Sequence, residues 1–347
     1  MSDSNSAGLR LLSLDGGGIR GLSMLLILQS IMYRIKAEEG LDEVPRPCDY
    51  FDLIGGTSTG GLIALMLGRL RMTVEDAISA YGRLSGDIFS EVKPVGSNGK
   101  FKATKLENGF KQVVREYSVS NDSEEEMRDT SDEICRIFVC AMNAANLNAA
   151  LPVLFRTYDT STEPADKCAI WEAARATTAA PTVFKAIKIG APGMEEVFID
   201  GGVGRNNPTA QVLEEAELIF PTRLLACVIS IGTGHPKTIQ IPTPSRIQRL
   251  IPLEVARAMI SMTTDCEKTH QEMARRFRDT PDVYFRFNVE QGLQGVKLNQ
   301  WDRLGEVLTH TRKYMLLEPV NQQLAKSVQV LLDKIGKVAT RALNGPF

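Results

Sequence analysis

Residues Tyr50–Leu67, YFDLIGGTSTGGLIALML, predict a buried strand, a tight turn and a buried helix. Within the turn, Gly56-Thr57-Ser58-Thr59-Gly60 fits the pattern G-x-S-x-G, in which a sharp bend between strand and helix exposes a serine hydroxyl. Glycines flank such a bend because side chains there would collide with their neighbours. Ser58 is therefore a candidate nucleophile. The alternative is a turn that only caps a helix, because serine and threonine are common helix caps.

A glycine-rich turn closes an earlier strand in the same way. Leu9–Asp15 is mostly apolar and leads into Gly16-Gly17-Gly18-Ile19-Arg20-Gly21, and a helix is expected from Leu22 to Glu39. Glycines at the start of a helix can present bare N–H groups to an oxygen that becomes negative during a reaction. If the two strands are parallel neighbours, both turns lie at the sheet edge where open α/β sheets place their sites. The turn is a candidate oxyanion hole, unless its glycines only permit close packing.

The same turn also fits a nucleotide-binding pattern. Gly16, Gly18 and Gly21 have the spacing G-x-G-x-x-G, so a nucleotide-binding module is a competing hypothesis. That fold places an acidic residue at the end of the second strand, where this sequence has the serine turn instead. Asp15 would also put a negative charge beside the pyrophosphate. Both features favour the oxyanion-hole interpretation.

A third turn supplies a candidate carboxylate. Glu196–Asp200 predicts a strand, Gly201 and Gly202 follow it, and a helix is expected from Pro208 to about Ile219. Aspartate before glycine is common in ordinary turns. At the end of a core strand, however, Asp200 would lie beside the other two turns.

Composition excludes several classes of protein. The 347 residues are 43% hydrophobic and carry a net charge of −2, so neither a nucleic-acid surface nor general attraction to anionic lipid is expected. The first residues, MSDSNSAG, contain no apolar signal segment, and the nearby apolar run Leu22–Met32 is too short to span a bilayer. The six cysteines include no CxxC pair, which favours reduced thiols over a metal site. A cytoplasmic protein is expected.

The remaining pattern predicts one α/β domain with a helical extension. The expected division is a disordered N-terminus (1–8), an α/β core (9–235) and a mainly helical C-terminal part packed on that core (236–347). The proline-rich segment Pro236–Pro244 marks the boundary. Beyond it, helical periodicity is expected over Arg246–Met262 and Arg303–Leu343, with a strand-like stretch at Val283–Val289 between them.

Two polar loops, Val92–Lys102 and Ser118–Glu133, interrupt the core. Val92–Lys102 carries three lysines and is either a solvated loop or a contact for lipid headgroups. Pro236–Pro244, at the boundary of the core, is a second candidate for lipid contact or a lid. Ser118–Glu133 is acidic but lacks the ligand spacing of an EF-hand, so calcium-independent action is expected.

Taken in order, Asp15–Gly21, Gly56–Gly60 and Asp200–Gly202 resemble the motifs D-G-G-G-x-[RK]-G, G-x-S-x-G and D-G-[GA] of the patatin-like phospholipase family. Each motif is weak alone, but the ordered set is specific, and the resemblance extends from about Leu9 to His235. It implies a three-layer α/β/α sandwich with a mainly parallel central sheet. It also implies a serine acyl hydrolase, phospholipase A2-like or a lysophospholipase, that cleaves fatty-acyl esters of membrane lipids.

The resemblance assigns roles to single residues. Ser58 would be the nucleophile and Asp200 its base, in a dyad that needs no metal or cofactor. The other assigned positions are the oxyanion donors Gly16, Gly17, Gly18 and Thr59, the loop supports Arg20 and Gly21, and the motif glycines Gly56, Gly60, Gly201 and Gly202.

A carboxylate is an unusual base for a serine, because its ordinary pKa of roughly 4 makes it weak at neutral pH unless burial raises that pKa. A Ser-His-Asp triad through His235, which follows a core strand, is the alternative. His270 and His310 are expected in helical, polar surroundings. The histidine-free dyad is the hypothesis that the three motifs favour.

The expected partner is a membrane or micelle surface, contacted peripherally, with no nucleic acid. A regulatory or fusion partner at the C-terminus is a further expectation from the resemblance. A catalytically silent lipid-binding or scaffold protein on the same fold is the alternative function, followed by the nucleotide-binding module.

Overall fold

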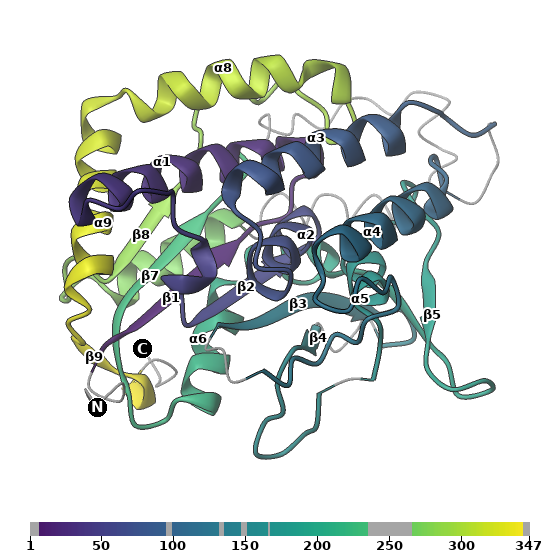
Figure 1. Ribbon diagram of the computed structural model, residues 1–347, viewed down its shortest axis with the longest axis horizontal. Coiled ribbons are helices and arrows are strands. Elements are labelled where there is room, and N and C mark those ends of the chain that lie inside the picture. Colours follow the sequence, from purple (N-terminus) through teal and green to yellow (C-terminus); the bar gives the residue numbers. More distant parts are fainter. Residues whose placement is uncertain are drawn as a thin grey trace.

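The computed structural model describes residues 7–94, 99–131, 135–146, 151–165, 167–234 and 266–342. A central sheet has the strand order β5-β6-β3-β2-β1-β7-β8, and β4 pairs with β3 and β9 with β7 (Figure 1). The strands are β1 Leu9–Leu14, β2 Leu53–Thr57, β3 Arg136–Asn143, β4 Val153–Arg156, β5 Ile187–Ile189, β6 Glu196–Asp200, β7 Leu224–Ile231, β8 Tyr284–Phe287 and β9 Val338–Ala339.

The middle of the sheet is parallel and its margins are antiparallel. β1 pairs in parallel with β2 and β7, β2 with β3, and β7 with β8. β4, β5, β6 and β9 run antiparallel to their neighbours. Because β1, β2 and β7 are parallel neighbours, the turns that follow them meet at one edge of the sheet. The glycine turn and the serine turn therefore lie side by side, as the sequence predicted.

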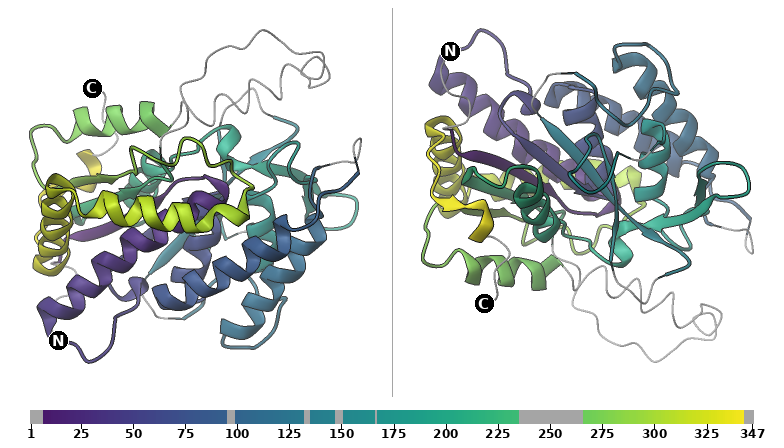
Figure 2. Two further views of the ribbon diagram at one scale, coloured as in Figure 1. Left: turned by 90° about the horizontal axis from the view of Figure 1, so that it is seen from above. Right: turned by 90° about the horizontal axis from the view of Figure 1, so that it is seen from below.

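Helices cover both faces of the sheet and give the expected three-layer α/β/α sandwich (Figures 1 and 2). The helices are α1 Leu22–Glu39, α2 Thr59–Ala64, α3 Val74–Phe89, α4 Ala103–Tyr117, α5 Ile170–Thr177, α6 Thr209–Ile219, α8 Leu304–Met315 and α9 Glu318–Asp333. α6 and the helical residues 266–276 pack on one face, and the other helices pack on the opposite face.

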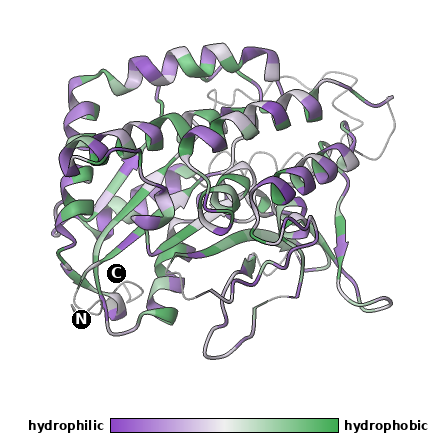
Figure 3. Cartoon of the chain, viewed as in Figure 1, coloured by the Kyte–Doolittle hydropathy of each residue, from purple (hydrophilic) through white to green (hydrophobic). Residues whose placement is uncertain are grey.

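The alternation of side chains along β1 supplies both hydrophobic cores. Leu12 and Leu14 belong to the core beneath α1, whereas Leu9 and Leu11 belong to the core that includes Val212 of α6. All four leucines are fully buried. Along helices such as α4 and α8, hydrophilic residues alternate with hydrophobic ones (Figure 3). The sheet is thus buried on both sides, as its near-continuous apolar strands require.

One predicted element differs from that found. The helical periodicity expected over Arg303–Leu343 does not hold at the end of that stretch, because β9 there pairs with β7 and completes a sheet margin. A two-residue strand is too short to show the alternation that marks strands in a sequence.

Some predictions fall on residues 235–265, which lie outside the described residues. They include the boundary segment Pro236–Pro244, the helix Arg246–Met262 and His235. Within the described part of the chain, no helix is long and apolar enough to cross a membrane.

Candidate active site

Ser58 stands at the bend between β2 and α2 with φ of 53° and ψ of −122°, a backbone conformation that L-residues rarely adopt. Its N–H donates to Thr177 Oγ1 at 2.8 Å, and the Thr177 hydroxyl donates to the carbonyl of Cys140 at 2.6 Å. A Cβ on Gly56 would lie 2.2 Å from the carbonyl oxygen of Gly60, so only glycine fits there. The conformation of the bend is therefore fixed by the Thr177 side chain as well as by the glycines within it.

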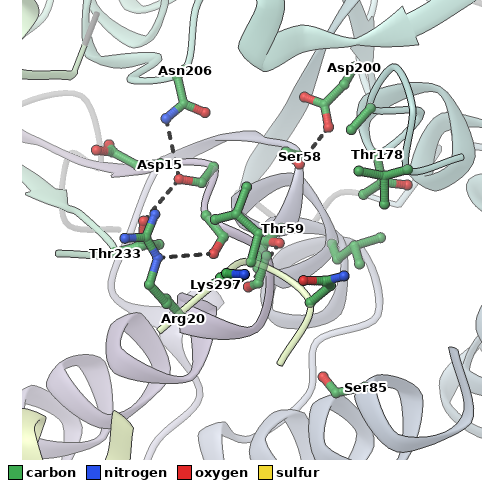
Figure 4. A pocket seen from close by; sticks show the side chains of 18 of the residues that line it. Asp15, Arg20, Ser58, Thr59, Ser85, Thr178, Asp200, Asn206, Thr233 and Lys297 are labelled. Atoms are coloured by element: carbon green, nitrogen blue, oxygen red, sulfur yellow. Dashed lines mark hydrogen bonds between the residues drawn. The ribbon is translucent and has the colours of Figure 1, made fainter. Parts of the chain in front are cut away.

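The carboxylate of Asp200 faces Ser58 (Figure 4). The Ser58 hydroxyl donates to Oδ2 at 2.7 Å, and the N–H of Gly202 donates to Oδ1 at 2.7 Å. Asp200 is fully buried, and burial raises the pKa of its carboxyl to about 7 against the opposing effect of these two hydrogen bonds. A carboxylate with a pKa near neutrality is a much better proton acceptor than an exposed one.

Asp200 reaches Ser58 through the register of an antiparallel strand. Thr57 pairs with Cys140 on one side of β3, and Asp200 pairs with Ala141 on the other side. The end of β6 therefore lies level with the start of the serine turn, although β6 runs in the opposite direction to β2. A Cβ on Gly201 would lie 2.3 Å from the carbonyl oxygen of Cys140, which explains the glycine after Asp200.

The glycine turn presents free N–H groups beside Ser58. Among the described residues, the N–H groups of Gly17, Gly18 and Thr59 have no hydrogen-bond partner. The prediction was wrong for Gly16, because its N–H donates to the carbonyl oxygen of Asn206 at 3.0 Å. Of the four predicted donors three therefore remain, Gly17 and Gly18 from the glycine turn and Thr59 from the start of α2.

Side chains hold the carbonyl groups of the three consecutive glycines, Gly16, Gly17 and Gly18. The contacts are Thr233 Oγ1 (3.0 Å) and Asn206 Nδ2 (3.3 Å) to Gly16, Arg20 Nε (3.5 Å) to Gly17, and Tyr81 Oη (2.5 Å) and Thr59 Oγ1 (3.1 Å) to Gly18. Arg20 is buried, and desolvation lowers the pKa of its guanidinium. Gly21 lies against Thr59, where a Cβ would come within 2.1 Å of Cγ2.

An ion pair between Asp15 and Arg286 lies behind the glycine turn. Arg286 Nη2 and Nη1 contact the two carboxylate oxygens of Asp15 at 2.6 and 3.0 Å, and the side chains are only 7% and 1% exposed. Arg286 Nη1 also donates to Ser230 Oγ at 2.8 Å. The sequence did not indicate Arg286, because it lies on β8, 271 positions after Asp15, and no local pattern links the two.

Ser58 and Asp200 line a cavity of about 470 Å³. An apolar part of its wall comes from α2, α3, α4 and the segment 183–184, through Leu62, Tyr81, Leu84, Ile88, Phe89, Leu106, Val183 and Phe184. A polar part is formed by Asp15, the glycine turn, Arg20, Asn206, Thr233, Arg286, Lys297 and Asn299. Lys100 and Leu298 line the cavity and are also exposed, so it opens to solvent beside them.

Neither of the described histidines lines this cavity. His270 Nδ1 lies 3.0 Å from the hydroxyl of Tyr284, and His310 packs against Gly292. Arg205, in the loop after Asp200, is half-buried, and its carbonyl accepts a hydrogen bond from the Thr57 hydroxyl at 2.8 Å.

Similarity to known proteins covers most of the chain. A family model described as patatin-like phospholipase matches residues 12–213. Phospholipase A I of Arabidopsis thaliana is 25% identical over 352 residues, covering 85% of this chain and 26% of that protein. Calcium-independent phospholipase A2-gamma of Rattus norvegicus is 28% identical over 295 residues, covering 81% of this chain and 35% of that protein. The chain thus spans about a quarter to a third of the length of these relatives.

One solved structure, the crystal structure of VipD from Legionella pneumophila, is similar over 89% of this chain and 67% of that one. The identity is 11% and the TM-score 0.38.

Proposed function

Because this chain belongs to the patatin-like phospholipase family, we propose that it is a serine-dependent lipid acyl hydrolase in which Ser58 is the nucleophile and Asp200 its base. The hydrogen bond of 2.7 Å between Ser58 Oγ and Asp200 Oδ2 carries the proposal, because a nucleophile and its base must be within direct reach. The strained bend at Ser58 and the raised pKa of Asp200 support the same roles.

In the acylation step, Ser58 Oγ attacks the carbonyl carbon of an acyl ester while its proton passes to Asp200. The carbonyl oxygen becomes an oxyanion, which the N–H groups of Gly17, Gly18 and Thr59 stabilise. The bond from this carbon to the alcohol oxygen then breaks, and the departing oxygen takes the proton from Asp200. The products of this half are a free alcohol and an ester between the acyl group and Ser58.

In the second half, water replaces the alcohol. Asp200 takes a proton from the water as its oxygen attacks the acyl carbon, and the same N–H groups stabilise the second oxyanion. The bond to Ser58 Oγ breaks, and Oγ recovers the proton from Asp200. A fatty acid leaves and the enzyme is restored. The groups of this chain complete both steps, so turnover is expected to be independent of calcium.

The cavity wall supports a lipid ester as substrate. Its apolar part can receive an acyl chain, and its polar part lies beside the exposed Lys100 and Lys297, which can attract a negatively charged headgroup. Leu298, which follows Lys297 in the sequence, and Trp301, four positions after Lys297, are each 40% exposed. An exposed tryptophan beside lysines is typical of a surface that contacts the membrane interface. We propose that the exposed residues Lys100, Lys297, Leu298 and Trp301 form a rim beside the cavity and that this rim faces the lipid aggregate.

A lipid panel with Ser58→Ala as control tests the function. Parent protein and variant are each incubated with phospholipid, lysophospholipid, galactolipid and triacylglycerol, and released fatty acid is measured with and without EDTA. Release by the parent only, unchanged by EDTA, is expected. A fluorophosphonate probe should label the parent at Ser58, and equal labelling of Ser58→Ala would contradict the nucleophile assignment.

The same samples separate the alternatives. Vesicle binding without any release of fatty acid would favour a silent lipid-binding protein. A rise in melting temperature with ATP or NAD, again without hydrolysis, would favour a nucleotide-binding module.

A further inference from the structure

Two buried side chains hold one carbonyl of the glycine turn. Thr233, which follows β7, donates its hydroxyl to the carbonyl oxygen of Gly16 at 3.0 Å, and Asn206, which precedes α6, donates its amide at 3.3 Å. The same side chains pack directly on the glycines. A Cβ on Gly17 would lie 2.0 Å from Thr233 Oγ1, and one on Gly16 would lie 2.2 Å from Asn206 Oδ1.

Holding this carbonyl determines where the next N–H points. The C=O of Gly16 and the N–H of Gly17 belong to one planar trans peptide, in which the two groups point in opposite directions. With its oxygen held by Thr233 and Asn206, the peptide turns the Gly17 N–H away from both side chains. That N–H has no partner among the described residues, and Gly17 lines the cavity that contains Ser58.

We propose that Thr233 and Asn206 are positioning residues that aim the Gly17 N–H at the oxyanion formed on Ser58. The inference rests on the proposed function, since it concerns the donors of that reaction. An oxyanion donor is effective only when it is already oriented before charge develops. Glycine has the widest choice of backbone conformations, so a turn of consecutive glycines needs outside contacts to keep one orientation. Thr233 and Asn206 supply them from positions 217 and 190 residues away.

Thr233→Val is the direct test, because valine keeps the shape and loses the hydroxyl. Thr233→Ser restores the hydroxyl and is the rescue variant. Thr340→Val is the matched control. Thr340 is buried like Thr233, and its hydroxyl holds the carbonyls of Phe220 (2.9 Å) and Arg223 (3.1 Å) at the opposite end of β7. Substitution at Gly17 itself is a poorer test, because a new side chain would collide with Thr233.

The measurements distinguish a change in the orientation of the Gly17 N–H from a change in the stability of the fold. They are kcat and KM on a soluble p-nitrophenyl ester, inhibition by a trifluoromethyl ketone, whose adduct with Ser58 carries an oxyanion, and the melting temperature. We expect Thr233→Val to lower kcat on the order of ten- to a hundredfold, less than the loss of a whole donor, with KM nearly unchanged. Inhibition by the trifluoromethyl ketone should weaken by the same factor. Thr340→Val should lower the melting temperature and keep kcat.

Several outcomes would overturn the inference. One is a Thr233→Val enzyme whose kcat stays within about twofold of the parent, and another is a Thr233→Ser enzyme as slow as Thr233→Val. A third is a loss that lies entirely in KM. If Thr233→Val does not fold, Asn206→Ala carries the same comparison, with a drop in kcat supporting the inference and an unchanged kcat rejecting it.

Failure of the proposed function would look different. A parent protein that neither hydrolyses the ester nor reacts with a fluorophosphonate at Ser58 would remove the proposed function and this inference together. An active parent with an equally active Thr233→Val variant would remove this inference alone.

Discussion

The hydroxyl of Ser58 donates a hydrogen bond of 2.7 Å to the carboxylate of Asp200, a residue 142 positions later that has no exposed surface. Burial raises the pKa of this carboxyl to about 7, and only the ionised form can accept the serine proton. We therefore expect kcat/KM on a soluble ester to rise with pH through about 7 and then to level off. A rise centred near the ordinary aspartate pKa of roughly 4 would show that Asp200 is not the titrating base.

Asp200→Asn should abolish turnover nearly as completely as Ser58→Ala, because members of one catalytic unit cost about as much singly as together. A combined alanine substitution of His235, His270 and His310 should keep turnover within about tenfold of the parent, a barrier change of roughly 1.4 kcal/mol. Initial rates on a p-nitrophenyl ester measure both, with circular dichroism as the check on folding. A folded histidine-free variant as inactive as Ser58→Ala would contradict the dyad and favour a triad.

The buried carboxyl should also make stability depend on pH. The pKa of Asp200 is higher in the folded than in the unfolded protein, so the folded state binds the proton more tightly. Its contribution to stability is complete below about pH 4 and is lost as pH rises through about 7. Asp200→Asn, which cannot ionise, should therefore gain stability over the parent between about pH 5 and pH 8. Melting temperatures measure this, with Ser58→Ala as a control that retains the titrating carboxyl. A difference in melting temperature between Asp200→Asn and the parent that stays the same at every pH would contradict the raised pKa.

Removing only one partner of the ion pair between Asp15 and Arg286 should strongly destabilise the folded protein. Arg286→Met leaves a buried carboxylate without its partner, and we expect a loss of about 3–5 kcal/mol in the free energy of unfolding. The double variant Asp15→Asn, Arg286→Met removes both charges and should recover part of that loss. Urea unfolding of the parent, the single variants Asp15→Asn and Arg286→Met, and the double variant gives the four free energies of the double-mutant cycle. A double variant whose loss equals the sum of the single losses would mean that the two charges do not interact.

The rim of the cavity should matter on lipid aggregates and not on a soluble ester. Trp301→Ser removes an exposed aromatic side chain four positions after Lys297 and is expected to weaken binding to anionic phosphatidylglycerol vesicles several-fold. Leu316→Ser is the matched control, because Leu316 is 81% exposed at the junction of α8 and α9. Vesicle co-sedimentation and hydrolysis of the soluble ester are measured in parallel. Equal vesicle binding by Trp301→Ser and the parent would place the lipid contact elsewhere.

The local parts of this site were predictable from the sequence because their requirements are local. A bend that holds Ser58 with positive φ needs glycine on either side, and the turn after β1 needs glycine where other residues press on it. Apolar runs on both sides of these glycines marked the strands and helices that carry them. The three turns and their order could thus be recognised from a few neighbouring residues at a time, and the sandwich was implied by the family resemblance that these motifs carry.

Tertiary structure decided which catalytic side chains come together and which backbone N–H groups are already hydrogen-bonded. The direction and register of β6, which bring Asp200 level with Ser58, depend on pairing with β3. The N–H of Gly16 is lost to Asn206, and Arg286 and Thr233 reach the glycine turn from more than two hundred residues away. Such contacts depend on how strands pair and pack across the whole sheet, and no pattern of neighbouring residues encodes them.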